Sequence, residues 1–215
     1  MMDAAVAIVI TEIMYNPASS EKQPVRVEWV EVYNRSERPV DLSGWKLCDE
    51  DGESGGIPQG ARLPGGETMI LIPKAQTPRN FLSGWPLQEH RDSTVIVQLD
   101  GWRRGGFGGL SNSPSPSNEM LVLRRANGST ADAVNFDDTE PWPSDSPEGP
   151  SIYLRPHAID PALNDRGENW ARSSVEEHGG RAARNRGGYS EKDIGSPGFV
   201  AIDRESEASD ATLRP

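Results

Sequence analysis

Apolar and polar residues alternate along several short segments of the chain, and this period of two predicts β-strands. The alternation is clearest in residues 25–34, VRVEWVEVYN, which place Trp29 and Tyr33 on one face and Val30 and Val32 on the other. Because both faces carry apolar side chains, the pattern predicts a strand that lies inside a β-sandwich and is covered on both sides.

The same signals predict further strands along the chain, with residues 93–100 at the edge of a sheet. Asn127-Gly128 is typical of a two-residue hairpin turn, and Gly44 indicates a bulge within its strand. No segment shows a helical period. Short strands separated by Gly and Pro turns predict an all-β sandwich with long loops. The other expected strands are residues 6–15, 40–49, 67–73, 93–100, 120–130 and 131–136.

Core-forming residues are unevenly distributed along the chain. Of 41 Leu, Ile, Val and Phe residues, 31 fall in residues 1–137 and only 10 in residues 138–215. The first part therefore has the apolar side chains that a core needs, and the second part is predicted to be rich in loops. Residues 201–215, AIDRESEASDATLRP, are predicted to form a disordered tail because they are polar and charged.

The net charge of −11 disfavours nucleic acid and anionic membrane surfaces as partners, since both require a basic face. The longest apolar run, residues 4–10, is far too short to span a membrane. That run also lacks a basic segment before it and a cleavage site after it, so it does not read as a signal peptide. A buried N-terminal strand is the preferred interpretation.

Cysteine and histidine offer little chemistry. A single cysteine, Cys48, excludes an intramolecular disulfide framework and a cysteine-rich zinc site. His90, His157 and His178 are far apart and show no ligand spacing. The chain also lacks the sequence motifs of serine hydrolases, zinc proteases, P-loop proteins and dinucleotide-binding folds, so we expect no enzyme and no cofactor.

Several stretches in a fixed order resemble the lamin-tail domain family. They include ITEIMYNP at 10–17, EWVEVYNRSERPVDLSGWKL at 28–47, a Gly-Gly turn before the strand at 65–72, GLSN at 109–112 and EMLVLRRANGSTADAVNF at 119–136. The match continues through Pro141-Trp142-Pro143, GPSIYLRP at 149–156, Asn169-Trp170 and GSPG at 195–198. The order is more similar to the bacterial, usually extracytoplasmic, branch than to nuclear lamins.

The resemblance implies an immunoglobulin-like β-sandwich over residues 6–200, with insertions near 74–92 and 172–193. It implies a non-catalytic module for protein binding, tethering or scaffolding. It also implies that the module is part of a bacterial protein that is extracytoplasmic, secreted or on the cell surface. The alternative is a carbohydrate- or calcium-dependent surface-binding module that accompanies a secreted hydrolase. The partner would be a protein or a surface glycan, and the sequence leaves the oligomeric state open.

Glu28 and Glu31 raise the question of an acid–base pair. Positions i and i+3 of a strand point to opposite faces, so these carboxylates cannot flank one substrate. Packing is the favoured interpretation of this stretch, with Trp29 and Trp45 in the structural core and the glutamates paired with basic groups or backbone amides.

Asp49, Asp51 and Glu53 surround a glycine and resemble half of a calcium loop. The later bidentate glutamate is missing, so a solvated acidic turn is favoured over a metal site. The acidic segment from Asp137 to Glu140 likewise lacks the full ligand pattern of a calcium loop.

Two Arg-Gly-Gly elements, at 103–107 and 186–189, resemble RNA-binding segments. The net negative charge favours a structural role for both.

Trp142 and Trp170 occupy family-like positions and are predicted to be structural. Trp85 and Trp102 lie in or beside variable loops, where exposed rings would stack on sugars or anchor a protein. The alternative, which is favoured, is that both rings cap the ends of the sandwich.

Overall fold

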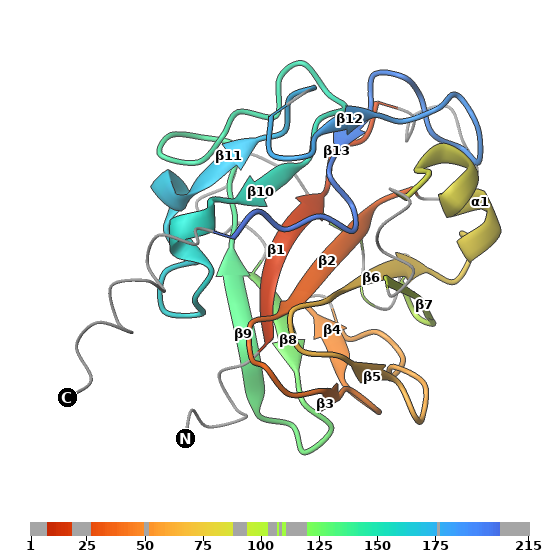
Figure 1. The fold of residues 1–215 in the computed structure, drawn as a ribbon, viewed down its shortest axis with the longest axis vertical. Coiled ribbons are helices and arrows are strands. Elements are labelled where there is room, and N and C mark those ends of the chain that lie inside the picture. The colour runs from red at the N-terminus through yellow and green to blue at the C-terminus, as the bar shows by residue number, and fades with distance from the viewer. Residues whose placement is uncertain are drawn as a thin grey trace.

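A computed structural model describes residues 8–18, 27–49, 52–87, 94–102, 107, 109–110, 120–175 and 177–202 (Figure 1). Its largest sheet has six strands in the order β11-β10-β1-β2-β6-β7. All neighbours in this sheet are antiparallel except β6 and β7, which run parallel. The strands are β1 (Ile8–Met14), β2 (Trp29–Asn34), β6 (Thr68–Pro73), β7 (Val95–Leu99), β10 (Ile152–Leu154) and β11 (Trp170–Arg172).

A second sheet of three antiparallel strands has the order β4-β8-β9. These strands are β4 (Lys46–Cys48), β8 (Met120–Arg124) and β9 (Thr130–Asn135). The predicted hairpin at Asn127-Gly128 joins β8 to β9, and Gly128 adopts the positive φ of 85° that such turns require. Two short pairs complete the strands: β3 (Val40–Asp41) with β5 (Arg62–Leu63), and β12 (Arg181–Ala182) with β13 (Ile194–Gly195).

The main core lies between the six-stranded and three-stranded sheets. Val30 and Val32 of β2 meet Leu121 and Leu123 of β8 in one buried cluster, together with Leu47 of β4. Burial of such side chains is the dominant favourable term in folding. The prediction of an all-β, immunoglobulin-like sandwich is confirmed.

A second core covers the opposite face of the large sheet and includes a short helix, although no segment of the sequence shows a helical period. Helix α1 (Pro78–Gly84) lies within the predicted insertion at 74–92 and places Phe81 against Trp29. Thr77 caps the helix by accepting a hydrogen bond from the Asn80 amide at 3.1 Å, and proline occupies the first turn. Seven residues are too few to display a helical period, so this Thr-Pro start was the only local signal.

The segment predicted as one strand at 40–49 is divided at Gly44. This glycine has a φ of 75° and lies in a turn between β3 and β4, instead of forming a bulge inside a continuous strand. A residue with a side chain rarely adopts that conformation, which explains the break.

Several parts of the predicted organisation are not tested by the structure. The bounds of one domain at residues 6 and 200 and the two insertions stay predictions. The predicted tail at 201–215 lies outside the described residues from residue 203 onward. Two short 3-10 helices, at Pro156–Ala158 and Gly167–Asn169, flank the β10–β11 connection. No helix in the described ranges is long and apolar enough to cross a membrane.

Candidate functional site

Two buried glutamates lie side by side on the outer face of the large sheet, the face that α1 also covers. Glu12 of β1 and Glu31 of β2 are Cα partners in the antiparallel ladder, and their exposed fractions are 1% and 0%. A bulge in β1 between Ile10 and Glu12 shifts the register next to this pair. Sequence reasoning did not identify Glu12, because a single glutamate in an apolar strand carries no motif.

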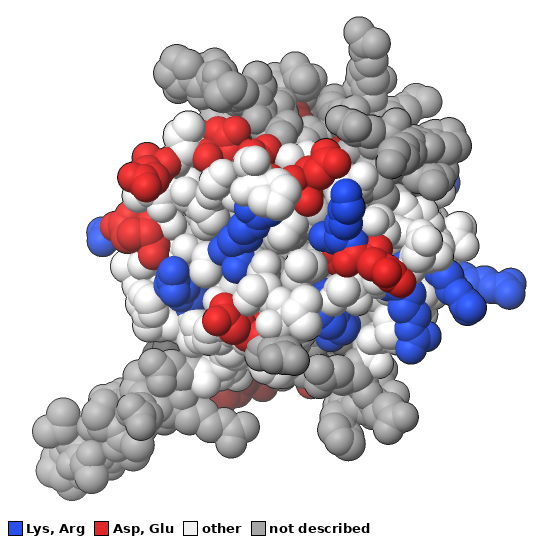
Figure 2. All heavy atoms as spheres, turned by 90° about the horizontal axis from the view of Figure 1, so that it is seen from above, with Lys and Arg blue, Asp and Glu red and all other residues white. Residues whose placement is uncertain are grey.

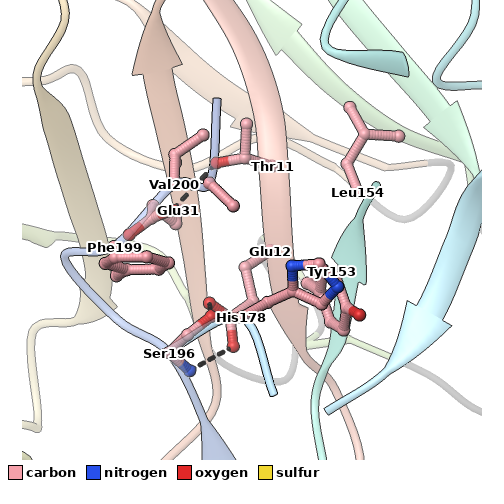
Figure 3. Close-up of a pocket in the computed structure, with 10 residues that line it drawn as sticks. Thr11, Glu12, Glu31, Tyr153, Leu154, His178, Ser196, Phe199 and Val200 are labelled. Carbon is pink, nitrogen blue, oxygen red and sulfur yellow. Dashed lines mark hydrogen bonds between the residues drawn. The ribbon is translucent and has the colours of Figure 1, made fainter. Parts of the chain in front are cut away.

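Glu12 accepts hydrogen bonds from distant parts of the chain, and Figure 3 shows Ser196 beside its carboxylate. Its Oε1 accepts from Ser151 Oγ at 2.5 Å and from the Ser196 amide at 2.8 Å. Its Oε2 accepts from Ser196 Oγ at 2.7 Å. Three donors compensate the carboxylate for the water that it loses on burial.

Glu31 is held in a similar way. Its Oε1 accepts from Thr11 Oγ1 at 2.9 Å, and its Oε2 accepts from the Gly198 amide at 2.7 Å. Donors to both glutamates therefore come from residues 194–200, which we call the C-terminal strap. The strap begins with β13 and crosses the face of the sheet in front of β1 and β2 (Figure 1).

The sequence Gly-Ser-Pro-Gly at 195–198 fits this position residue by residue. A Cβ on Gly195 would lie 2.9 Å from Glu12 Oε1, closer than real side chains approach, and 3.0 Å from a ring carbon of Trp29, which is an unusually tight contact. Gly198 has a φ of 81°. The carbonyl of Pro197 accepts a hydrogen bond from Arg181 Nη2 at 2.8 Å. The GSPG motif is therefore the part of the chain that closes over the acidic pair.

Arg181 supplies the positive charge next to this pair. Burial lowers the pKa of its guanidinium, while attraction to Glu12 and Glu31 acts in the opposite direction. Burial raises the pKa of Glu12, and the hydrogen bonds from Ser151 and Ser196 and the charge of Arg181 offset only part of that effect. The site thus holds two carboxyl groups against one cation.

A small pocket opens beside the pair. Its volume is about that of one water molecule, and the Glu12 and Glu31 oxygens on its wall already accept hydrogen bonds from the chain itself. The pocket is too small for an organic substrate. The hydrogen bonds that its two carboxylates accept from Ser196 and Gly198 hold the strap in place. It is lined by Thr11, Glu12, Glu31, Tyr153, Leu154, His178, Ser196, Phe199, Val200 and Ala201.

Glu28 lies on the opposite face of β2 from Glu31. Its Oε2 accepts from Trp102 Nε1 at 3.1 Å and from the Leu110 amide at 3.3 Å, on the side of the main core. The two glutamates therefore do not form an acid–base pair, and each binds backbone amides on its own face. Glu12 and Glu31 do form a pair, but they lie on two different strands. The spacing of residues within one strand therefore cannot predict that pair.

A further buried carboxylate connects the two sheets. Asp132 Oδ2 accepts from the Ile10 amide and from Asn164 Nδ2, both at 2.7 Å. Burial raises the pKa of Asp132 to about 6, although its hydrogen bonds oppose the shift.

The two tryptophans considered as candidate ligand contacts, Trp85 and Trp102, are buried. Trp85 has no exposed surface and Trp102 is 4% exposed, so neither ring is available to stack on a sugar or anchor a partner. The burial agrees with the favoured interpretation and leaves the ligand-contact alternative without support, because Trp85 packs edge to face against Trp29, and Trp102 packs against Phe107. Trp29 and Trp45, placed in the core by the sequence, are 0% and 7% exposed.

In the acidic loop at 49–53, the carboxylates of Asp49 and Glu53 already interact with other groups of the protein. Glu53 forms ion pairs with Lys46 and, at 3.5 Å, with Arg124. An Asp49 carboxylate oxygen accepts the Gly52 amide at 2.8 Å, while Asp51 lies outside the described residues. Within the described ranges, no group of three or more His, Cys, Asp or Glu side chains is arranged to hold a metal ion.

The second Arg-Gly-Gly element is a packing element. Its Tyr189 is 2% exposed and lies 5.9 Å from Phe81 and 5.5 Å from Trp85, ring centre to ring centre. A Cβ on Gly187 would lie 2.0 Å from the Asn80 carbonyl oxygen of α1. In the first element, residues 103–106 lie outside the described part of the chain.

Comparisons with known proteins give one clear match. A family model described as Lamin Tail Domain matches residues 2–138. Among solved structures, a DUF4876 family protein from Bacteroides thetaiotaomicron is similar, with 13% identity and a TM-score of 0.43. That similarity covers 92% of this chain and 72% of the other, and is too low to support an argument. No curated protein matches the chain.

Proposed function

The chain belongs to the Lamin Tail Domain family, and from that premise we propose that it is a non-catalytic immunoglobulin-like module that binds and tethers a protein partner. The observation that carries the proposal is the edge strand β7. It is the last strand of the six-stranded sheet, and its outer edge pairs with no other strand of the described residues. Such an edge is a ready template for strand addition by an extended peptide.

The direction of the backbone groups of β7 follows from one hydrogen bond. The Lys74 amide donates to the Leu99 carbonyl at 3.0 Å, so Leu99 uses the edge that faces β6. Backbone groups alternate along a strand, and Ile96 and Gln98 therefore direct their N–H and C=O groups to the outer edge. Val95 and Ile96 are half-buried, and their side chains pack against the main core and the second core respectively.

We further propose that the module acts outside the bacterial cytoplasm without a cofactor. The order of family-like motifs supports this compartment, and fractionation of cells with an antibody to the parent protein tests it. Figure 2 shows acidic and basic side chains mixed on the face of the molecule seen from above, with no continuous basic surface. This mixture supports a protein partner over nucleic acid, which requires a basic surface.

A backbone-specific pair of variants tests the edge. Gln98→Pro removes the outward N–H, and proline is tolerated at such edge positions. Gln98→Ala is the matched control, since it also removes the side-chain bonds to the Lys74 and Gln76 carbonyls but keeps the N–H. Peptides selected from a random display library on the wild-type domain are the probe.

We expect such peptides to bind Gln98→Ala like the wild type and Gln98→Pro at least tenfold more weakly. Hydrogen exchange should slow at the Ile96 and Gln98 amides when peptide binds. Equal binding to both variants, with no protection in β7, would show that the partner uses another surface.

The carbohydrate and calcium alternatives have no structural feature in the described residues comparable to the unpaired edge of β7. Trp85 and Trp102 are buried, and Glu53 is paired with cationic side chains.

A further inference from the structure

The C-terminal strap is held over the sheet by bonds to ionisable groups. The Ser196 amide and hydroxyl donate to Glu12, and the Gly198 amide donates to Glu31. The strap lies beyond residues 2–138, which the family model matches, whereas both glutamates lie within that range. We propose that the strap is a pH-sensitive latch, which is closed over Glu12 and Glu31 in acid and loosens as the pH rises.

The geometry provides the reason. Glu12 and Glu31 occupy directly opposite positions of β1 and β2, and both side chains are buried. Like charges directly opposite on neighbouring strands are unfavourable, and burial disfavours the charged form of a carboxyl, so a proton on one of the two groups relieves both costs. When the strap lifts, water solvates both carboxylates and the extra proton is no longer held.

The other charged groups around the pair do not balance the negative charge that the two carboxyl groups would carry when both are ionised. From β12, Arg181 contributes one positive charge. From the neighbouring segments, the Tyr153 hydroxyl and the His178 imidazole line the same pocket, and their rings lie 5.1 Å apart. The strap itself contributes only backbone and hydroxyl donors. The closed latch therefore contains two acids, one arginine, one tyrosine and one histidine.

Proton linkage sets the sign of the effect. Burial raises the pKa of Glu12 in the closed state above its ordinary value near 4.5. In the proposed open state water reaches the carboxyl, and its pKa moves back toward that value. The closed state is thus favoured below about pH 4.5, and this advantage is lost as the pH rises through the raised value. One linked proton changes the opening equilibrium by up to about tenfold per pH unit in that window.

The test is hydrogen exchange at the Ser196 and Gly198 amides between pH 5 and 8, compared in the wild type and Glu12→Gln. The substitution is far from both amides in the sequence, so the ratio of the two rates at each pH cancels the intrinsic exchange rate. We expect the wild-type strap to lose protection relative to Glu12→Gln as the pH rises, up to about tenfold per unit. Glu31→Gln replaces Glu12→Gln if the latter does not fold.

Two controls assign the effect. Asp132→Asn removes a buried carboxyl away from the strap and should leave the pH dependence of strap exchange unchanged. His178→Asn removes the histidine at a position with a φ of 46°, which asparagine tolerates. The pH dependence should survive this change as well.

Three outcomes would overturn the latch. The first is a protection factor that does not change with pH, or that changes equally in Glu12→Gln. The second is a pH dependence that disappears in His178→Asn. The third is an equal loss of protection at core amides such as Val32, which would mean that the whole domain opens and not the strap alone.

Discussion

Glu12 and Glu31 are Cα partners across β1 and β2, and both carboxylates are buried on the face that the C-terminal strap covers. This relationship joins the first two strands of the sheet to the last described segment of the chain. A buried carboxylate without partners would be costly, so the donors of the strap and the two acids stabilise each other's positions.

Removal of one strap donor tests this mutual dependence. Ser196→Ala deletes the hydroxyl that donates to Glu12 Oε2 at 2.7 Å but keeps the backbone amide that donates to Oε1. We expect a loss of about 1–3 kcal/mol in the free energy of unfolding, since a buried acceptor loses one of its partners. Urea denaturation measures it. Ser129→Ala, on the exposed β8–β9 turn, is the control. Equal stability of the two variants would contradict the role given to Ser196.

The aromatic cluster beneath α1 predicts a large effect of truncation. Trp29 is fully buried and packs edge to face against Phe81 and Trp85. Trp29→Ala should therefore cost about 3–5 kcal/mol, within the range for large core aromatics. Leu82→Ala in the same helix region is the control, because Leu82 is 41% exposed and should cost far less. Thermal unfolding by circular dichroism compares them, and a similar melting temperature for both would be inconsistent with the packing.

The buried Asp132 predicts that part of the stability is lost as the pH rises. Its pKa is raised from 3.8 to about 6 in the folded state, so folding favours the protonated form. This contribution is fully present below about pH 3.8 and is lost as the pH passes through about 6. Near neutral pH the loss is on the order of 3 kcal/mol.

Denaturation at pH 4.5 and 7.5 measures this effect in the wild type and Asp132→Asn. The substitution should reduce the difference in unfolding free energy between the two pH values. An unchanged difference would assign the pH dependence to other groups, such as the Glu12 pair.

Calcium should leave the melting temperature unchanged. Glu53 is already paired with Lys46 and Arg124, and the Asp49 side chain accepts the Gly52 amide. A ligand that binds the folded state raises the melting temperature by mass action, so millimolar calcium would produce a visible shift if a site existed. Differential scanning fluorimetry with calcium, with magnesium and with chelator distinguishes specific binding from ionic strength. A rise with calcium alone would restore the metal hypothesis.

The sequence by itself determined the strands and the faces of its clearest segments. Alternation in residues 28–34 separated Glu28 from Glu31, because side chains in a strand alternate whatever the strand packs against. Asn127-Gly128 specified its hairpin for an equally local reason, namely the positive φ of the turn. Such features depend on a few consecutive residues, and these carry enough information to define them.

Tertiary structure alone decided which residues form the site. Ser151 and Ser196 reach Glu12 across sequence separations of 139 and 184 residues, and no local pattern encodes these contacts. The same holds for Trp85, which the sequence placed beside a variable loop and the fold buries beneath Tyr189. A periodic pattern shows that a side chain will be buried, but its neighbours depend on how the strands associate, and that association is decided by the packing of the whole core.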